Sequence, residues 1–489
     1  MKLSVLLALL LSMGPVRAEG TGRFPPCDPK AERQRLVFVH VSDIHANYSP
    51  GPDGASPMAR LRGYFELVRS TEPYALFTDG GDSHDKGSVL EQISKGWSTD
   101  RIVRSMRYDV RTMGNHDFAW GGDEAFAFSR DTATLVLASN LSYTGKDPSL
   151  WGAKDYGELQ VGCVRVGFFG MVSRSWSDQD EPSEAPHHPD VASRLDYAAV
   201  ARDIVSRRRK DVGLLVMVSH LGLEADEKLA AEVPGIDLVL GAHTHDITWK
   251  GRRVGDTFII QAGNWAKLAG RVEVDYDLRA GTAAAVTGGL WRNDRGKVKA
   301  DPAVQRAVEA EAALYAPDLG KELAFVKQAR DKRQIAAVAA AAARGAIKAD
   351  AALVDAKTAW AVWTPGAVDL QGVYDTFKVE RQPPGGPGFS SFMTAEVSGK
   401  DLALIRDKAD AGRFAFSGPE AIAPGRTYTL ALQKRTASAP GRWLPTGVSL
   451  KKVQQAGEVW EVLKAYAASR TAACLHLDTD DRLPDCVPK

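Results

Sequence analysis

Five short polar segments, spread from residue 43 to residue 245, constrain the fold of this chain more than any other feature. Each segment ends or closely follows a run rich in Val, Ile, Leu or Phe, as happens where a β-strand passes into a loop. No single helix or hairpin could bring the five together, so a sheet must collect these loops at one edge. The segments are Asp43-Ile44-His45, Gly81-Asp82 with Asp85 and Gly87, Gly114-Asn115-His116-Asp117, Ser219-His220 and Gly241-Ala242-His243-Thr244-His245.

The polar side chains of these segments are a mixture of carboxylate, imidazole and amide groups. This mixture suits a hard or borderline divalent metal ion. Because the candidates are too many for one ion, we expect two ions that share one bridging carboxylate. The candidate ligands are Asp43, His45, Asp82, Asn115, His220, His243 and His245.

Length and composition set broad limits on the protein. The chain of 489 residues is long enough for two or three domains, and 44% hydrophobic and 25% charged residues are values typical of a globular protein. A formal net charge of +1 argues against a protein that binds a nucleic-acid polymer through charge. We therefore expect a small-molecule substrate.

The N-terminus has the features of a secretory signal peptide. Lys2 precedes a short apolar run over residues 3–11, and Val16-Arg17-Ala18 is a suitable cleavage site. The apolar run is too short to cross a bilayer, and no other stretch is long and apolar enough to do so. We expect a signal peptide over residues 1–18, an N-terminal extension over 19–35, and a secreted or periplasmic protein.

The cysteine count fits an oxidising compartment. An even number of cysteines outside the cytoplasm favours disulfides, and four cysteines allow three pairings. Cys474 and Cys486 would close a short loop, and this leaves Cys27 to pair with Cys163. We favour this pairing over the other two.

The pattern along the chain predicts two domains. Over residues 36–298, apolar strands such as 36–42 and 214–218 alternate with helical stretches such as 58–70, which indicates an α/β architecture with covered sheets. Residues 299–348 are rich in Ala, Glu, Lys and Arg and predict a helical connector. A smaller α+β domain is expected over 349–489.

Further motifs, in the same order along the chain, carry a family resemblance. They are Gly80-Gly81-Asp82, the segment 114–121, Ala138-Ser139-Asn140-Leu141 and Gln261-Ala262-Gly263. With the five polar segments, they resemble the calcineurin-like metallophosphoesterases, and within these the secreted two-domain 5′-nucleotidases. The resemblance implies a four-layer α/β/β/α sandwich, a helical connector and a smaller α+β C-terminal domain.

The chemistry of such a site can be assigned to the candidate ligands. Asp43, His45 and His245 would hold one metal, Asn115, His220 and His243 would hold the other, and Asp82 would bridge both. Zinc, manganese and iron all suit these ligands. A hydroxide between the two metals would attack phosphorus in line.

The resemblance implies a catalytic role for His116, which would act as general acid or stabiliser on the leaving-group side. Enzymes of this family usually read GNHEFD, and the final Asp pairs with the His. This chain has Ala119 at that position, so Asp117 is the nearest substitute in sequence. We expect Asp85 to shape its loop, and His84 to lie at the surface.

The second domain departs further from the family pattern. Phe414 and Phe416 are the candidates for the first of two aromatics that sandwich a nucleobase in the family. The second aromatic is replaced near Lys434-Arg435, and the family's arginine motif is replaced around Trp360. A nucleoside monophosphate is therefore not expected to be the best substrate, because base stacking contributes about 1–3 kcal/mol.

The sequence thus predicts a secreted dinuclear-metal phosphoesterase that hydrolyses a phosphate ester or anhydride. One alternative keeps the metal site and changes the substrate to a sugar phosphate, a cyclic nucleotide or a thiosulfate-type ester. A second alternative, from a different class, is a non-catalytic metal-binding protein that recognises a partner.

Overall fold

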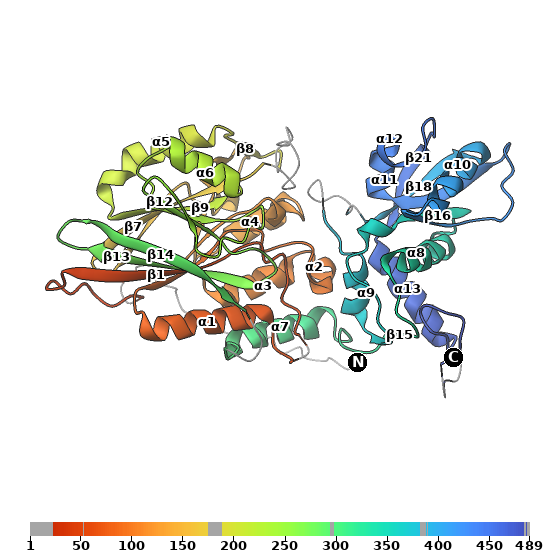
Figure 1. Ribbon diagram of the computed structural model, residues 1–489, viewed down its shortest axis with the longest axis horizontal. Helices are drawn as coiled ribbons and strands as arrows, with labels where there is room; N and C mark the ends of the chain where they lie inside the picture. The colour runs from red at the N-terminus through yellow and green to blue at the C-terminus, as the bar shows by residue number, and fades with distance from the viewer. Residues whose placement is uncertain are drawn as a thin grey trace, which may run out of the picture.

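The computed structural model describes residues 23–51, 53–174, 188–293, 298–381, 388, 390–483 and 486. The signal peptide expected over residues 1–18 lies outside the described residues. Two domains lie side by side along the long axis of the molecule and meet near α2 (Val89–Ser94) and α9 (Leu370–Thr376) (Figure 1).

Two six-stranded sheets form the centre of the first domain. The first has the order β14-β13-β1-β2-β3-β4, with β1 to β4 parallel, and the second has the order β11-β12-β10-β9-β7-β6, with β7, β9, β10 and β12 parallel. The strands of the first sheet are β1 (Arg33–Val41), β2 (Ala75–Asp79), β3 (Val110–Thr112), β4 (Leu135–Leu137), β13 (Leu268–Asp277) and β14 (Thr282–Arg292). Those of the second are β6 (Gly157–Val161), β7 (Val164–Val172), β9 (Leu214–His220), β10 (Leu238–Gly241), β11 (Arg252–Val254) and β12 (Thr257–Gln261).

Strand β1 shows why the sheets stack. Its side chains alternate between two apolar cores, because successive residues of a strand point to opposite faces. Leu36 and Phe38 face the second sheet, while Val37 and Val39 face the helices on the other side. From Leu36 onward β1 is buried on both faces and is apolar except at His40, as expected for a strand covered on both sides.

Helices cover the outer face of each sheet and complete four layers. The first sheet is covered by α1 (Pro57–Thr71), α3 (Trp97–Met106) and α7 (Pro302–Tyr315), and the second by α5 (Tyr197–Arg208) and α6 (Leu223–Glu232). The expected α/β/β/α sandwich is confirmed. Shorter elements of this domain are η1 (His116–Phe118), α4 (Gly122–Ser129), β5 (Leu141–Tyr143), η2 (Pro148–Leu150), β8 (Val191–Ser193) and η3 (Arg209–Asp211).

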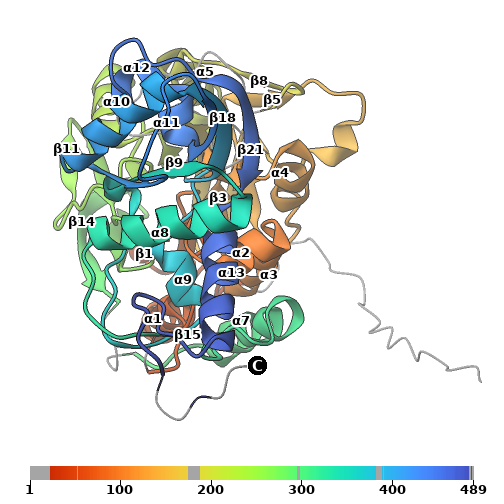
Figure 2. The same ribbon diagram turned by 90° about the vertical axis from the view of Figure 1, so that its right-hand side faces the viewer.

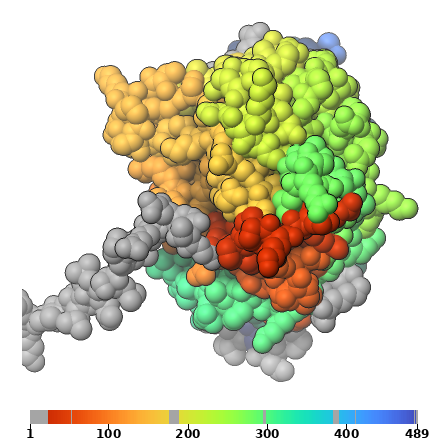
Figure 3. All heavy atoms as spheres, turned by 90° about the vertical axis from the view of Figure 1, so that its left-hand side faces the viewer, coloured from red at the N-terminus to blue at the C-terminus, as the bar shows by residue number. Residues whose placement is uncertain are grey.

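A disulfide holds the first described residues against the first domain. Cys27 is bonded to Cys163, and Arg279 in the turn between β13 and β14 forms an ion pair with Glu32. Figure 3 shows this N-terminal segment, in red, lying across the surface of the domain. The favoured cysteine pairing is confirmed, because the second disulfide joins Cys474 to Cys486.

The second domain is built on one five-stranded sheet with the order β19-β16-β20-β18-β21. One face packs on α8 (Lys332–Ile347) and α13 (Val459–Ala472), which cross on the near side in Figure 2, and the other face packs on α10 (Gly399–Asp410). The strands are β16 (Ala351–Asp355), β18 (Phe392–Ser398), β19 (Phe414–Ser417), β20 (Thr427–Gln433) and β21 (Lys451–Gly457). Smaller elements are β15 (Ala324–Val326), η4 (Ala356–Thr358), β17 (Gly366–Val368), α11 (Lys434–Ser438) and α12 (Pro440–Trp443).

The stretch expected to be a helical connector is shared between the domains. Helix α7 packs against α1 and α3 in the first domain, whereas the alanine-rich α8 packs in the core of the second. The small side chains of α8 let the helix lie close to the sheet. The second domain also touches the first through α9, where Tyr374 and Val379 pack with Val89 of α2.

Candidate metal centre

The seven candidate ligands come together at one edge of the sandwich. Asp43, Asp82 and Asn115 follow β1, β2 and β3 of the first sheet, His220 ends β9 of the second sheet, and His243 and His245 follow β10. The carboxyl ends of parallel strands lie at the same edge of a sheet. Stacking the two sheets therefore places both sets of loops together.

These side chains form two groups of three that could each hold an ion. The groups are Asp43 with His45 and His245, and Asp82 with His220 and His243, and the ligand atoms in each group lie within 4.8 Å of one another. Asn115 belongs beside the second group, because its Oδ1 is 3.0 Å from His220 Nε2.

Asp82 belongs to the second group and also lies close to the first. Its Oδ2 is 3.2 Å from His220 Nε2 in one group and 3.8 Å from His45 Nε2 in the other. Its Oδ1 accepts a hydrogen bond from the backbone N–H of His116 at 2.8 Å. This carboxylate is therefore placed to be shared by two cations.

Backbone carbonyls orient two of the imidazoles. His220 Nδ1 donates to the carbonyl of Gly80 at 2.7 Å, and His45 Nδ1 donates to the carbonyl of His84 at 3.2 Å. A hydrogen bond of this kind fixes the tautomer and leaves the Nε2 lone pair for a metal.

The loops that carry the ligands adopt unusual backbone conformations. Asp43, His45, Asp82, His243 and His245 have φ values between 49° and 82°, a left-handed region that costs a non-glycine residue about 1–2 kcal/mol. The loops also approach one another closely: a Cβ on Gly114 would lie 2.1 Å from Asp82 Oδ1. Strain of this kind persists only where the surrounding structure imposes it, and it is common at functional sites.

Burial and neighbouring charges shift the pKa values of this donor set in different directions. Burial lowers the pKa of His45 and of His243 well below 6.5, so both rings stay neutral. Burial alone would raise the pKa of Asp82, but the neighbouring His220 and His116 outweigh it and hold the pKa well below its usual range. Burial would lower the pKa of His220, but the charge of Asp82 outweighs it and raises this pKa to about 10, and burial raises the pKa of Asp43 to about 7. Because metal ligands must be deprotonated, a bound ion would take the place of the His220 proton beside Asp82. Imidazole, carboxylate and amide donors grouped in this way fit divalent ions.

His116 is paired with Asp85 and not with Asp117, which corrects the expectation from the sequence. His116 Nδ1 donates to Asp85 Oδ2 at 3.0 Å. Asp117 instead binds His84 Nδ1 at 2.7 Å and accepts the backbone N–H groups of Ser83 and Gly114. Adjacent residues in the short helix η1 point in different directions, so the Asp117 side chain is not placed to accept the proton of His116.

His84 is buried, so the expectation of a surface residue was wrong. Its side chain is 0% exposed, and its ring stacks on Phe128 with centroids 4.0 Å apart.

The nearby His40 is also buried. It connects the two sheets beneath the ligands, because its ring nitrogens contact Thr78 Oγ1 at 3.0 Å and the Gly241 carbonyl at 3.1 Å.

Phe414 and Phe416 do not form an exposed aromatic surface. Phe414 belongs to the core between the second domain's sheet and α10 and is only 4% exposed, and Phe416 packs, partly buried, against the same core. The assignment of these two residues to substrate binding is therefore corrected. They lie two positions apart in β19, so they share the face that packs toward α10.

Two residues of the second domain, Trp360 and Lys378, approach the centre through Trp265 of the first domain. Trp265, close to the ligand His45 with ring centroids 5.3 Å apart, contacts Trp360 edge to face at 5.8 Å. The ammonium of Lys378 lies 4.8 Å from the Trp265 ring centroid. These contacts join segments about 100 residues apart, so no local sequence signal could reveal them.

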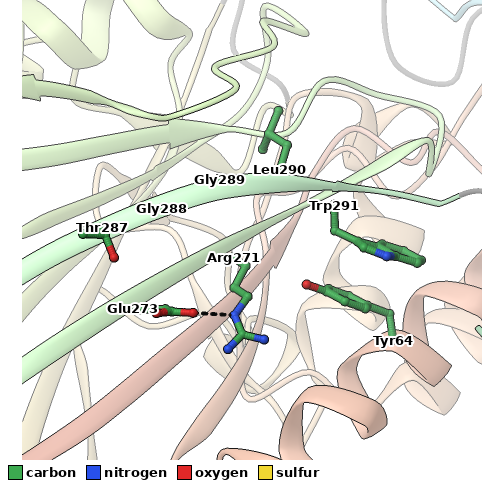
Figure 4. A pocket seen from close by; sticks show the side chains of 8 residues that line it. All are labelled: Tyr64, Arg271, Glu273, Thr287, Gly288, Gly289, Leu290 and Trp291. Atoms are coloured by element: carbon green, nitrogen blue, oxygen red, sulfur yellow. Dashed lines mark hydrogen bonds and ion pairs between the residues drawn. The ribbon is translucent and has the colours of Figure 1, made fainter.

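A separate hollow lies on the outer face of the first sheet. It has a volume of about 450 Å³ and is lined by residues of α1, β13 and β14, including the stacked rings of Tyr64 and Trp291 and the ion-paired Arg271 and Glu273 (Figure 4). None of the seven candidate ligands lines it. We do not assign it to the metal centre.

The fold and the ligand arrangement define a class. Residues 36–246 match the family model of the calcineurin-like phosphoesterases. That stretch holds all seven candidate ligands and His116. The first domain of this chain is therefore a calcineurin-like phosphoesterase domain.

Within this class the relatives are 5′-nucleotidases. The 5′-nucleotidase of Rattus norvegicus is 25% identical over 239 residues, which make up 46% of this chain and 40% of the rat enzyme. The human 5′-nucleotidase is 21% identical over 308 residues, 57% of this chain and 52% of that enzyme. The matched stretch thus spans about half the length of these relatives, or less.

Solved structures share the two-domain architecture. A 5′-nucleotidase precursor from Thermus thermophilus superposes with a TM-score of 0.65 at 21% identity, over 89% of this chain and 96% of that one. A sulfate thiohydrolase of Thermus thermophilus superposes with a TM-score of 0.61 at 16% identity, over 91% of this chain and 95% of that one. At these identities the likeness shows the fold alone.

Proposed function

We propose that this chain is an exported phosphoester hydrolase that uses two divalent metal ions to cleave a phosphate ester or anhydride of a small molecule. The observation that carries the proposal is the position of Asp82, which belongs to one three-residue ligand group and lies 3.8 Å from His45 Nε2 of the other. A pair of bound ions would supply polarisation of the phosphoryl oxygens and activation of a water molecule for in-line attack.

His116 would supply the proton to the leaving group. Asp85 accepts the Nδ1 proton of His116, so Nε2 is the ring nitrogen that would carry out the transfer. The ring lies edge to face with that of His45, with centroids 5.0 Å apart, and therefore sits beside the ligands. General acid catalysis of this kind contributes about 10²–10⁴-fold to a rate.

Export is proposed from the N-terminal sequence and the disulfides. Residues 1–18 have the features of a signal peptide, and the two disulfides suit a secreted or periplasmic location. Within the part of the chain that the structure describes, no helix is long and apolar enough to cross a membrane. Sequencing the N-terminus of the exported protein tests this, with Glu19 expected as the first residue.

We propose that the substrate carries a phosphate ester like that of a 5′-nucleotide, and that the enzyme makes few contacts that distinguish the base. The burial of Phe414 and Phe416 favours a second candidate, in which the same metals act on a sugar phosphate, a cyclic nucleotide or a thiosulfate-type ester. The thiohydrolase among the structural neighbours is consistent with such a range of substrates.

Hydrolysis of AMP and of an aryl phosphodiester by the purified protein tests the function. Each assay is run after EDTA treatment and again after Mn²⁺ or Zn²⁺ is restored, beside Asp82→Asn. Asp203→Asn is the matched control, because Asp203 is an exposed residue of α5. We expect metal-dependent turnover that Asp82→Asn abolishes and Asp203→Asn retains. Two bound metals without turnover on any ester would instead favour a non-catalytic, partner-recognising protein.

A further inference from the structure

The candidate metal centre is most exposed at His245. The side chain of this ligand is 29% exposed, whereas the other six candidate ligands are buried. Solvent therefore reaches the ligand atoms on the His245 side, and a substrate would approach from there. Whatever lines this side is placed to contact the part of the substrate that projects away from the phosphate.

Trp265 is attached to all three ligands of the group that contains His245. Its backbone N–H donates to the carbonyl of Asp43 at 2.9 Å, and its ring centroid lies 5.3 Å from that of His45. The residue before it, Asn264, has its Nδ2 3.0 Å from His245 Nδ1. The indole of Trp265 is therefore fixed beside the metal site, on its exposed side.

Trp360 of the second domain extends this aromatic surface. Its ring meets that of Trp265 edge to face with centroids 5.8 Å apart, and its backbone N–H donates to the Thr376 carbonyl at 2.9 Å. The ammonium of Lys378 lies 4.8 Å from the Trp265 ring centroid and 3.2 Å from Asp375 Oδ1. Trp360 itself is 46% exposed, so nearly half of its surface can still contact a ligand.

We propose that Trp265 and Trp360 form a subsite that binds an aromatic ring in the leaving group of the substrate. An aromatic ring can stack on an indole, and such stacking tolerates different rings because each has a π face. The inference rests on the proposed function for the metals that hold the phosphate. It narrows the substrate to esters of an alcohol that carries a planar aromatic ring.

A second exposed tryptophan provides the matched control. Trp249 is also 46% exposed, but its ring packs on Arg292 at the end of β14, with the guanidinium carbon 4.7 Å from a ring centroid. Replacing either tryptophan by alanine removes the same exposed side chain. An effect of lost surface area alone would therefore appear in both variants.

Calorimetric binding of two phosphonates to the full chain loaded with Mn²⁺ tests the proposal. The probes are 2-phenylethylphosphonate and ethylphosphonate, which differ only in the ring and have a carbon–phosphorus bond in place of the ester. We expect the parent to bind the phenyl compound about tenfold more tightly, since stacking on an aromatic side chain contributes about this factor.

The variants should change this preference for the ring and little else. Trp360→Ala should bind the two phosphonates about equally, with its ethylphosphonate affinity unchanged. Trp360→Phe and Trp249→Ala should keep most of the preference. A folded Trp360→Ala that still prefers the phenyl compound, or a parent that does not prefer it, would overturn the inference.

The binding measurement separates this inference from the proposed function. If the ring preference is present and Trp360→Ala loses it, but no ester is hydrolysed, the subsite stands and the hydrolase is wrong. If esters are hydrolysed without any ring preference, the hydrolase stands and the subsite is wrong. If neither phosphonate binds the metal-loaded parent, the subsite and the proposed phosphate site are both wrong.

Discussion

Two histidine–aspartate pairs join the same two loops in opposite directions. His84, in the loop after β2, pairs with Asp117, in the segment after β3, at 2.7 Å. His116, in the segment after β3, pairs with Asp85, in the loop after β2, at 3.0 Å. The two pairs have the same chemistry and differ only in what surrounds them.

The surroundings give the pairs different roles. Asp117 also accepts the amides of Ser83 and Gly114, and His84 lies flat on Phe128, so this pair fastens the two ligand loops to the core. His116 instead lies against His45 and the metal ligands, and its partner Asp85 also binds the second domain. Under the proposed function, environment and not the identity of the pair would separate a pair that holds two loops together from a pair that contains the proton donor.

The largest effect that would test this comparison is expected for Asp85→Asn. The amide cannot accept the His116 proton in the same way, so kcat should fall by about 10²–10⁴-fold, while the melting temperature changes little. Steady-state kinetics and thermal unfolding of the metal-loaded protein measure both. If kcat is unchanged and the melting temperature falls, Asp85 holds its loop in place and the assigned roles are wrong.

A large loss of stability is expected for Asp117→Asn. Removing one charge of a buried pair leaves the other unpaired, so the free energy of unfolding should fall by about 3–5 kcal/mol. Urea unfolding measures this. The folded Asp117→Asn protein should retain more of the parent kcat than Asp85→Asn retains. If it retains less, the roles assigned to the two pairs are reversed.

A smaller effect is expected for Phe128→Leu, which removes the ring beneath His84. Loss of the stacked contact and of some packing should lower the unfolding free energy by about 1–2 kcal/mol. The KM and kcat of the folded protein should stay unchanged, because the Phe128 ring packs on His84 and Trp97, which belong to the fastening side of the comparison. A fall in kcat greater than the fall in folded fraction would show that the two pairs are coupled.

The smallest effect is a pH dependence of the His84–Asp117 pair. Burial lowers the pKa of His84, but the bond to Asp117 and its charge outweigh burial, so the pKa lies above 6.5. Burial raises the pKa of Asp117, but His84 outweighs it, so that pKa lies below 3.8. The pair's contribution is thus fully present between pH 3.8 and 6.5, is lost as the pH rises through the raised pKa of His84, and is also lost as the pH falls through the lowered pKa of Asp117.

The difference in unfolding free energy between the parent and Asp117→Asn measures this contribution. It should be larger at about pH 5.5 than at about pH 9. A difference that grows with pH would mean that His84 is neutral in the folded protein.

The strand and helix pattern predicted an α/β architecture, and the family resemblance predicted the four-layer sandwich. All seven candidate ligands could be named from the sequence because each lies at or close after a strand end. Position along a strand is a local property, and the alternation of apolar runs with polar segments reveals it. The partner of His116 is not a local property. Asp117 is its neighbour in sequence, yet the contact is made by Asp85, 31 residues earlier, so proximity along the chain misled the assignment.

The second domain was harder to interpret for the same reason. Phe414 and Phe416 gave an aromatic signal, but whether a strand face is buried depends on the helix that packs on it, here α10. The contacts of Glu380 and Arg381 with residues 85 and 86 span almost 300 residues. Only the docking of two complete domains produces such contacts.

The left-handed backbone of five candidate ligands has a consequence beyond catalysis. A chain without metal would offset the unfavourable conformations by packing alone, and ions that bind only the folded state would add to its stability by mass action. The lifetime of the protein in the presence of proteases would then follow the local supply of metal. Scarcity of the ion would reduce not only the rate of each molecule but also the number of intact molecules.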